Sequence, residues 1–172
     1  MPDDKIICIT GATGWIGRSA VLAASRIFSP EQLSSNILLF ASKESFIRHP
    51  TDINSKLRVR ALSDLVSISR SHHISAILHS AFLTRDRLND IGIDEFICKN
   101  RIITDIVRTA ALNSPQIKIA IMSSGAAKAW DFKQVYNQQL QSHAYSILKK
   151  EEERLLTEVS ETMILRIYAL SG

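Results

Sequence analysis

The chain has 172 residues, 45% of them hydrophobic and 22% charged, which is enough for one well-buried domain and too few for two. Its formal net charge of +4 comes from basic residues scattered among 17 acidic ones, a pattern that argues against a nucleic-acid-binding protein. No apolar run is long enough to span a bilayer, and the N-terminus lacks the layout of a signal peptide. The two cysteines, Cys8 and Cys98, have no ligand-like spacing. We therefore expect residues 1–172 to form one cytoplasmic domain that binds neither nucleic acid nor membrane.

Short apolar runs bounded by turn residues predict six strands. They cover residues 5–10, 36–41, 57–62, 74–80, 117–123 and 162–168. Helical patterns cover residues 15–28, 89–112 and 143–158. Near-continuous apolar strands that alternate with helices are typical of a parallel sheet covered on both faces. The predicted fold class is therefore α/β, a Rossmann-like doubly wound parallel sheet, with residues 42–56 and 125–142 as its least regular parts.

Three of the six glycines stand three residues apart between the first strand and the first helix, as Gly11, Gly14 and Gly17. In that context Gly11 allows a tight exit from the strand, Gly14 a close approach of the backbone to a pyrophosphate, and Gly17 close packing of helix on strand. The helix N-terminus adds free N–H groups and a positive dipole end. The alternative is a tight turn whose glycines are incidental.

These residues resemble a known family. The stretch TGATGWIG, residues 10–17, is similar to the signature of the extended short-chain dehydrogenase/reductases, the epimerase/dehydratase group that acts mostly on nucleotide sugars. Further motifs follow in the family's order along the whole chain: His79-Ser80-Ala81, Asn100 with Thr104, Ser123-Ser124, Tyr145 to Lys149 as Tyr-x-x-x-Lys, and the segment LRIYALSG, residues 165–172.

The resemblance implies an NAD(P)-dependent epimerase- or reductase-type oxidoreductase that transfers a hydride at a sugar hydroxyl carbon. It also implies a nucleotide-sugar substrate and a possible homodimer through the helices at 89–112 and 143–158. No metal site is expected. The catalytic residues that it implies are Ser124, Tyr145 and Lys149. The cofactor-binding residues are Gly11, Thr13, Gly14, Trp15, Ile16, Gly17, Ser42, Lys43, His79, Ala81, Asn100, Tyr145 and Lys149.

The chemistry needs a base for the substrate hydroxyl proton, and a phenol with an ordinary pKa of about 10 is a poor one at neutral pH. On a helix, Lys149 shares a face with Tyr145, so its charge is expected to favour the phenolate. Ser124 would hold the substrate hydroxyl, with Ser123 in its place if the strand ends one residue earlier. The alternative for Tyr145 and Lys149 is an amphipathic surface pair.

The end of the second strand predicts which dinucleotide is bound. NAD enzymes usually place an acid there for the ribose hydroxyls, but this chain has Ala41. Ser42 and Lys43, with Arg18 nearby, are suited to a 2'-phosphate, so NADP is favoured. NAD stays possible if Glu44 reaches the ribose.

Several residues also have a structural interpretation. Trp15 is expected to pack behind the glycine turn, and Asn100 is as readily a helix-stabilising residue as a cofactor ligand. Asp64 is either an adenine contact or a helix N-cap. The run KKEEERLL, residues 149–156, is expected to be mainly a solvated helical face.

Two departures from the family matter. The acidic pair that its dehydratases carry after the catalytic Ser or Thr is absent, so a 4,6-dehydratase is not expected. The chain also ends where family members continue into a smaller domain that holds the nucleotide sugar. The substrate domain is thus expected to be missing, and the alternative function is a non-catalytic NAD(P)-binding module or sensor.

Overall fold

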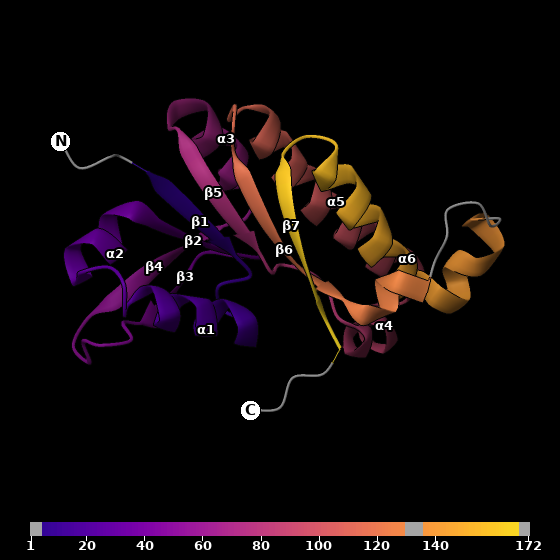
Figure 1. Cartoon of the computed structure of the whole chain (residues 1–172). Helices are drawn as coiled ribbons and strands as arrows, with labels where there is room; N and C mark the ends of the chain where they lie inside the picture. The colour runs from indigo at the N-terminus through magenta and orange to yellow at the C-terminus, as the bar shows by residue number, and fades with distance from the viewer. Residues whose placement is uncertain (1–4, 130–135, 169–172) are drawn as a thin grey trace.

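The computed structural model describes residues 5–129 and 136–168 (Figure 1). Its strands form one seven-stranded sheet in the order β3-β4-β2-β1-β5-β6-β7. In chain order the strands are β1 (Ile6–Thr10), β2 (Ile37–Ala41), β3 (Ser45–Arg48), β4 (Lys56–Ala61), β5 (Ile74–His79), β6 (Lys118–Ser124) and β7 (Glu161–Ile167).

Six α-helices and one short 3-10 helix connect the strands. They are α1 (Trp15–Ala24), α2 (Pro30–Asn36), α3 (Asp64–Ser71), α4 (Arg85–Ile91), α5 (Ile93–Leu112), the 3-10 helix η1 (Gly125–Ala129) and α6 (Tyr136–Thr157). Helix α6 has a kink at His143, whose φ and ψ are −133° and 24°.

All neighbouring strands are parallel except β3, which runs antiparallel to β4. The chain starts at β1 in the middle, moves outward through β2, and returns to the other side of β1 with β5. The carboxyl ends of β1 and β5 therefore flank the point where the strand order reverses, which is where open α/β sheets bind ligands. The predicted α/β, Rossmann-like doubly wound fold is confirmed.

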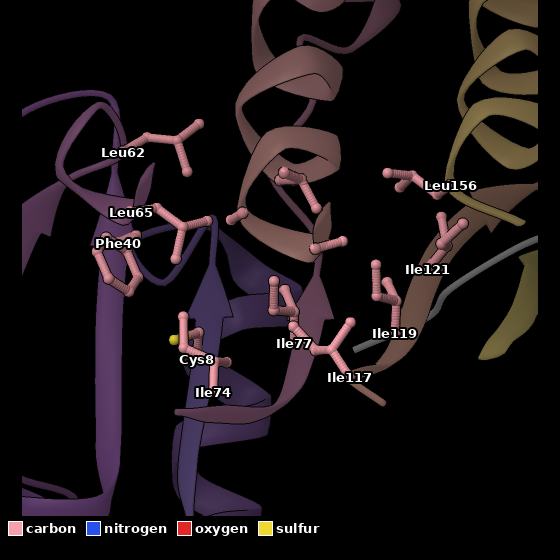
Figure 2. Close-up of a cluster of buried hydrophobic side chains, with 13 residues drawn as sticks. Cys8, Phe40, Leu62, Leu65, Ile74, Ile77, Ile117, Ile119, Ile121 and Leu156 are labelled. Atoms are coloured by element: carbon pink, nitrogen blue, oxygen red, sulfur yellow. The ribbon is translucent and has the colours of Figure 1, made fainter. Parts of the chain in front are cut away.

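Successive residues of the central strands pack on opposite faces of the sheet, as a two-residue period requires. Cys8 and Phe40 contribute to a core under α3, α5 and α6, which Figure 2 shows. Their neighbours Ile9 and Leu39 belong to a second core, on the face covered by α1 and α2. Burial on both faces explains why these strands read as continuous apolar runs.

The helices leave part of one face open. On the side of α1 and α2, none of the helices within residues 5–129 and 136–168 covers β6 and β7 (Figure 1). Met163 and Leu165 on β7 are accordingly 62% and 42% exposed.

Four elements differ from the sequence-based predictions. The sequence did not predict β3, because its four side chains alternate between half-buried and exposed at the sheet edge and the strand follows a polar turn. α2 begins with a capping box, in which Ser29 accepts from the N–H of Gln32 and the Gln32 side chain accepts from the N–H of Ser29, a start signal that the apolar pattern did not reveal. α3 was missed as well. The helix expected over 89–112 is two helices, because Gly92 adopts a φ of +80° that breaks the run.

Candidate functional site

The glycine turn links the end of β1 to α1. Gly11 has a φ of +71°, in the left-handed region that favours glycine. A Cβ there would also lie 2.8 Å from backbone atoms of Ser80 and Ala81, which follow β5. A Cβ on Gly17 would lie 2.2 Å from the carbonyl oxygen of Gly11. Two of the three glycines are thus required by the packing of the turn itself.

The third glycine, Gly14, is the exposed N-cap of α1. A Cβ on it would meet only the Gly11 carbonyl oxygen, at 3.2 Å. No side chain caps the helix, and its first turn holds no acidic residue. The N-terminal N–H groups of α1 and their positive dipole end therefore face an open surface beside Thr13, Trp15 and Ile16, which is suited to an anion.

Trp15 does not pack behind the turn as expected. It is the first residue of α1 and is 54% exposed. The prediction that it is mainly a packing residue is therefore wrong. Its sequence neighbours Thr13 and Gly14 are exposed as well.

Ser42 and Lys43 follow β2 at the same edge of the sheet, and both are exposed. The next residue, Glu44, is held by Arg58 of β4, whose Nε donates to Glu44 Oε1 at 2.7 Å. A second nitrogen of the same guanidinium lies 2.6 Å from that oxygen. The acid that could have contacted a ribose is thus engaged with a neighbouring strand.

A pocket of about 520 Å³ opens at the carboxyl end of β6. Its lining includes Ser124, Tyr145 and Arg85, together with Thr84, Asp86, Gly125, Ala126, Ile167 and Tyr168. The Ser124 hydroxyl accepts a hydrogen bond from the N–H of Ala126 at 3.2 Å. The structure therefore brings Ser124 and Tyr145, predicted from distant segments of the chain, to one cavity.

Aromatic and cationic contacts hold Tyr145. The Phe82 ring lies edge-on to it, with centroids 5.8 Å apart and planes at 87°, and the Arg85 guanidinium carbon lies 5.1 Å from its centroid. Arg85 also donates to the Ser146 hydroxyl at 3.3 Å. Sequence reasoning missed both residues, since an Arg after a strand and a Phe beside an apolar run carry no signal of their own.

Lys149 is buried, and its ammonium has specific partners. Nζ donates to the Met122 carbonyl oxygen at 3.1 Å and to Glu152 Oε2 at 2.9 Å, and it lies 3.8 Å from the centroid of the Phe82 ring. Lys149 is therefore part of an ion pair that the sequence did not predict. The expectation that its charge serves the Tyr145 phenol stays a prediction.

His79 closes β5 in full burial, with 1% of its surface exposed. Its Nδ1 lies 2.7 Å from the Thr10 hydroxyl and its Nε2 lies 3.0 Å from Glu152 Oε1. Burial alone would raise the pKa of Glu152, but the Lys149 ammonium and the adjacent His79 ring lower it below the ordinary value. The lowered pKa favours the ionised form of Glu152.

Ser123 does not face the pocket. Its hydroxyl donates to Glu153 Oε1 at 2.7 Å, and Arg166 of β7 forms a bidentate pair with the same carboxylate at 2.9 and 2.7 Å. Burial acts to raise the pKa of Glu153, but the bonds from Arg166 and Ser123 outweigh it and lower the pKa. With Glu152 and Glu153 buried, the expectation of a mainly solvated face for residues 149–156 is wrong.

Asn100 is buried in α5 and ties that helix to the segment after β5. Its side-chain oxygen accepts from the N–H of Leu83 at 2.8 Å, and its amide nitrogen donates to the carbonyl oxygens of Phe96 and Leu83 at 3.1 and 3.4 Å. These bonds favour the structural interpretation of Asn100. Asp64, for its part, is the first residue of α3, whose N-cap is Ser63.

Within residues 5–129 and 136–168, no cluster of three His, Cys, Asp or Glu residues could hold a metal ion. No helix in the described part of the chain is long and apolar enough to cross a membrane.

Solved structures with the same fold include dehydrogenases and an epimerase. L-threonine 3-dehydrogenase from Trypanosoma brucei matches with a TM-score of 0.67 and 20% identity, over 94% of this chain and 52% of that one. UDP-glucose 4-epimerase from Bifidobacterium longum, in complex with NAD+ and UDP, matches with a TM-score of 0.61 and 15% identity over 94% and 52%. MoeE5, in complex with UDP-glucose and NAD, gives 0.59 and 20% over 92% and 52%.

At these identities the likeness shows the fold. A further match, with a TM-score of 0.57, is a short-chain dehydrogenase/reductase superfamily protein from Agrobacterium tumefaciens with bound NAD. The likeness to these structures thus confirms the predicted fold. The sequence matches no protein-family model and, at the significance required, no curated protein. The chain spans about half the length of the solved structures above.

Proposed function

We propose that this chain binds a nicotinamide dinucleotide across the carboxyl ends of β1, β2 and β5 and supports Tyr-assisted hydride transfer at a hydroxyl carbon of a nucleotide sugar. The observation that carries the proposal is the juxtaposition of an uncapped glycine turn with a pocket that contains Ser124 and Tyr145. Both lie at the edge of a parallel sheet where such ligands bind.

The residues of the turn fit a pyrophosphate. Gly14 leaves an exposed backbone surface at the N-terminus of α1, where N–H groups have no side-chain cap. Ala81 follows β5 across the strand-order reversal from that turn. This arrangement supports binding of the phosphates by backbone N–H groups and the helix dipole, without a requirement for a basic side chain.

In the proposed reaction, the Tyr145 phenol oxygen takes the proton from the substrate hydroxyl, which the Ser124 hydroxyl holds by a hydrogen bond. When bound, the nicotinamide supplies the hydride acceptor. Arg85 lies over the Tyr145 ring and holds it beside the pocket by a cation–π contact. The complexes of MoeE5 with UDP-glucose and of the epimerase with UDP support a nucleotide sugar as the substrate class.

We infer a preference for NADP from Ser42 and Lys43, which directly follow β2, and from the pairing of Glu44 with Arg58. Isothermal titration with NADPH and NADH tests this inference. Lys43→Ala is expected to weaken NADPH binding by about tenfold, as loss of one cation–phosphate contact does, and to leave NADH binding unchanged. Lys56→Ala, at the opposite end of the neighbouring strand β4, is the matched control. Tighter NADH binding by the unmodified chain would contradict the preference.

Turnover is tested by following the nicotinamide absorbance with UDP-glucose as the probe. Tyr145→Phe is expected to lower the rate by about 10²- to 10⁴-fold, the usual contribution of a general base, with dinucleotide affinity retained. Ser124→Ala and Ser123→Ala form a matched pair, of which only Ser124→Ala is expected to slow the reaction directly. Dinucleotide binding without turnover on any nucleotide sugar would favour the non-catalytic module.

We also propose a homodimer through α5 and α6, where Ile102 of α5 is 51% exposed. Sedimentation equilibrium measures the oligomeric state. A monomer that Ile102→Glu leaves unaltered would contradict this proposal.

A further inference from the structure

A chain of buried polar side chains connects the end of β1 to α6 beneath the candidate site. Thr10, His79, Lys149 and Glu152 are 0%, 1%, 4% and 0% exposed. One oxygen of Glu152 lies 3.0 Å from His79 Nε2 and the other accepts from Lys149 Nζ at 2.9 Å. The Thr10 hydroxyl lies 2.7 Å from His79 Nδ1, and Thr10 is directly followed by the glycine turn.

The hydrogen atoms of this chain follow from its partners. The N–H of Ala81 donates to Thr10 Oγ1 at 3.3 Å, which leaves the hydroxyl proton of Thr10 available for His79 Nδ1. Glu152 Oε1 lies 3.0 Å from His79 Nε2, although this contact does not have hydrogen-bond geometry, and an ionised carboxylate can only accept hydrogen bonds. We therefore expect the Nε2–H tautomer of His79, with Nε2 on the side of Glu152 and Nδ1 on the side of the Thr10 hydroxyl.

A buried carboxylate, ammonium and imidazole are costly compared with apolar residues of the same volume. A protein can keep such a costly arrangement for function when it fixes a flexible functional side chain, as hydrogen-bond partners do for the groups that they orient. Lys149 is such a side chain, because four rotatable carbons separate its ammonium from the backbone. Glu152, one helical turn further on, and the Met122 carbonyl hold Nζ at one position.

We propose that Glu152 is a positioning residue. It fixes Lys149 and, through His79 and Thr10, connects it to the glycine turn, so that these two parts of the dinucleotide site, Lys149 and the turn, keep a constant relative position. This inference rests on the proposed function, since it takes Lys149 as part of the dinucleotide site. The inference goes beyond the proposed function because it assigns the orienting role to Glu152, a residue that does not touch the ligand.

The test combines the tautomer of His79 with dinucleotide affinity, both measured on the full chain. Long-range ¹H–¹⁵N correlation spectra report which imidazole nitrogen is protonated, and His79→Gln assigns the signal among the five histidines. In Glu152→Gln, the new amide oxygen can still accept from Lys149, but its NH₂ group must donate to His79. We expect the proton to move from Nε2 to Nδ1. Glu151→Gln, the same change one residue earlier in a glutamate that pairs with Arg101 at the surface, is expected to leave the tautomer unchanged.

For NADPH and NADH, Glu152→Gln is expected to weaken binding by about tenfold, the low end of what loss of an orienting partner costs at metal sites. Glu152→Asp keeps the charge and is expected to keep the Nε2–H tautomer and to restore part of the affinity. Full affinity in Glu152→Gln, or an Nδ1–H tautomer in the unmodified chain, would overturn the positioning role. Absence of dinucleotide binding by the unmodified chain would instead overturn the proposed function, and the tautomer readout separates the two failures. If Glu152→Gln does not fold, Glu152→Asp decides: loss of the Nε2–H tautomer, or affinity equal to the unmodified chain despite the shorter side chain, contradicts the proposal.

Discussion

Replacement of Gly17 by alanine tests whether the glycine turn depends on close packing. The added methyl carbon would lie 2.2 Å from the Gly11 carbonyl oxygen and 2.7 Å from Ala12 Cα, about 1 Å short of an ordinary contact. Both obstacles are backbone atoms, so α1 or the turn must shift. Overpacking of this kind costs about 1–3 kcal/mol, whereas alanine in a helix interior gains about 1 kcal/mol over glycine. The net loss is then about 0–2 kcal/mol, and because both obstacles are backbone atoms we expect a value at the upper end, about 2 kcal/mol.

Gly14→Ala is the matched control, three residues away in the same turn. Its methyl carbon would lie 3.2 Å from the same carbonyl oxygen, and its φ of −76° suits any residue. The weaker N-cap and the stiffer unfolded chain have opposite effects of similar size, so the free energy of unfolding should change by less than about 0.5 kcal/mol. Dinucleotide affinity should fall instead, since the methyl group occupies the exposed backbone surface.

Thermal and urea unfolding, both followed by circular dichroism, measure the stability of the two variants. For a chain of this length, a loss of 2 kcal/mol corresponds to a fall in Tm of about 4–8 °C, and the slope of the free energy of unfolding against urea concentration should not change. A Gly17→Ala protein as stable as the unmodified one would refute the close-packing argument. Equal destabilisation by both substitutions would show that the turn tolerates no side chain for a reason other than the Gly11 carbonyl.

Three further predictions concern buried polar groups. The folded-state pKa of Glu153 lies below its ordinary value of 4.5, so the ionised side chain stabilises the fold above that pH, and this stabilisation is lost as the pH falls through the folded-state pKa. Glu153→Gln should lower the free energy of unfolding at pH 7 by about 1–3 kcal/mol, because it removes the charged partner of Arg166. Acid unfolding curves should therefore show a smaller loss of stability for the variant than for the unmodified chain. Burial raises the pKa of the Cys8 thiol to about 12. A thiol reagent at pH 8 should therefore label only the exposed Cys98 in native protein, and both thiols after unfolding. Rapid labelling of both cysteines in native protein would contradict this prediction. Asn100→Ala should lower the free energy of unfolding by about 1–3 kcal/mol, because it leaves the half-buried N–H of Leu83 without its side-chain acceptor. A change below about 0.5 kcal/mol in urea titration would argue against that role.

The sheet could be predicted from sequence because its central strands are buried on both faces. Ile37–Ala41 and Ile74–His79 are apolar enough to be recognised without any partner. The edge strand Ser45–Arg48 is different, since its side chains alternate between half-buried and exposed and only its pairing with β4 makes it a strand. Elements whose stability comes mainly from a neighbour leave a weak local pattern.

The candidate site divides in the same way. Its backbone component, the glycine turn, is encoded locally, and the spacing of Gly11, Gly14 and Gly17 was sufficient to place it. The pocket required motifs from separate segments, and the family's order supplied Ser124 and Tyr145. Arg85, which contributes the positive charge nearest the Tyr145 ring among the described contacts, belongs to no motif and was found only from the structure.

The three consecutive glutamates of α6 show why charge patterns on a helix need the tertiary structure. Successive residues point about 100° apart, so the three carboxylates face three different surroundings. Glu151 reaches Arg101 of α5, Glu152 turns toward His79 and Lys149, and Glu153 meets Arg166 of β7. From sequence they are one charged run whose simplest interpretation is a solvated face. Two of them are buried because α6 packs against the sheet, where His79 of β5 faces Glu152 and Arg166 of β7 faces Glu153. Lys149 of α6 itself completes the first of these clusters, and only the tertiary structure brings the strand residues to the helix.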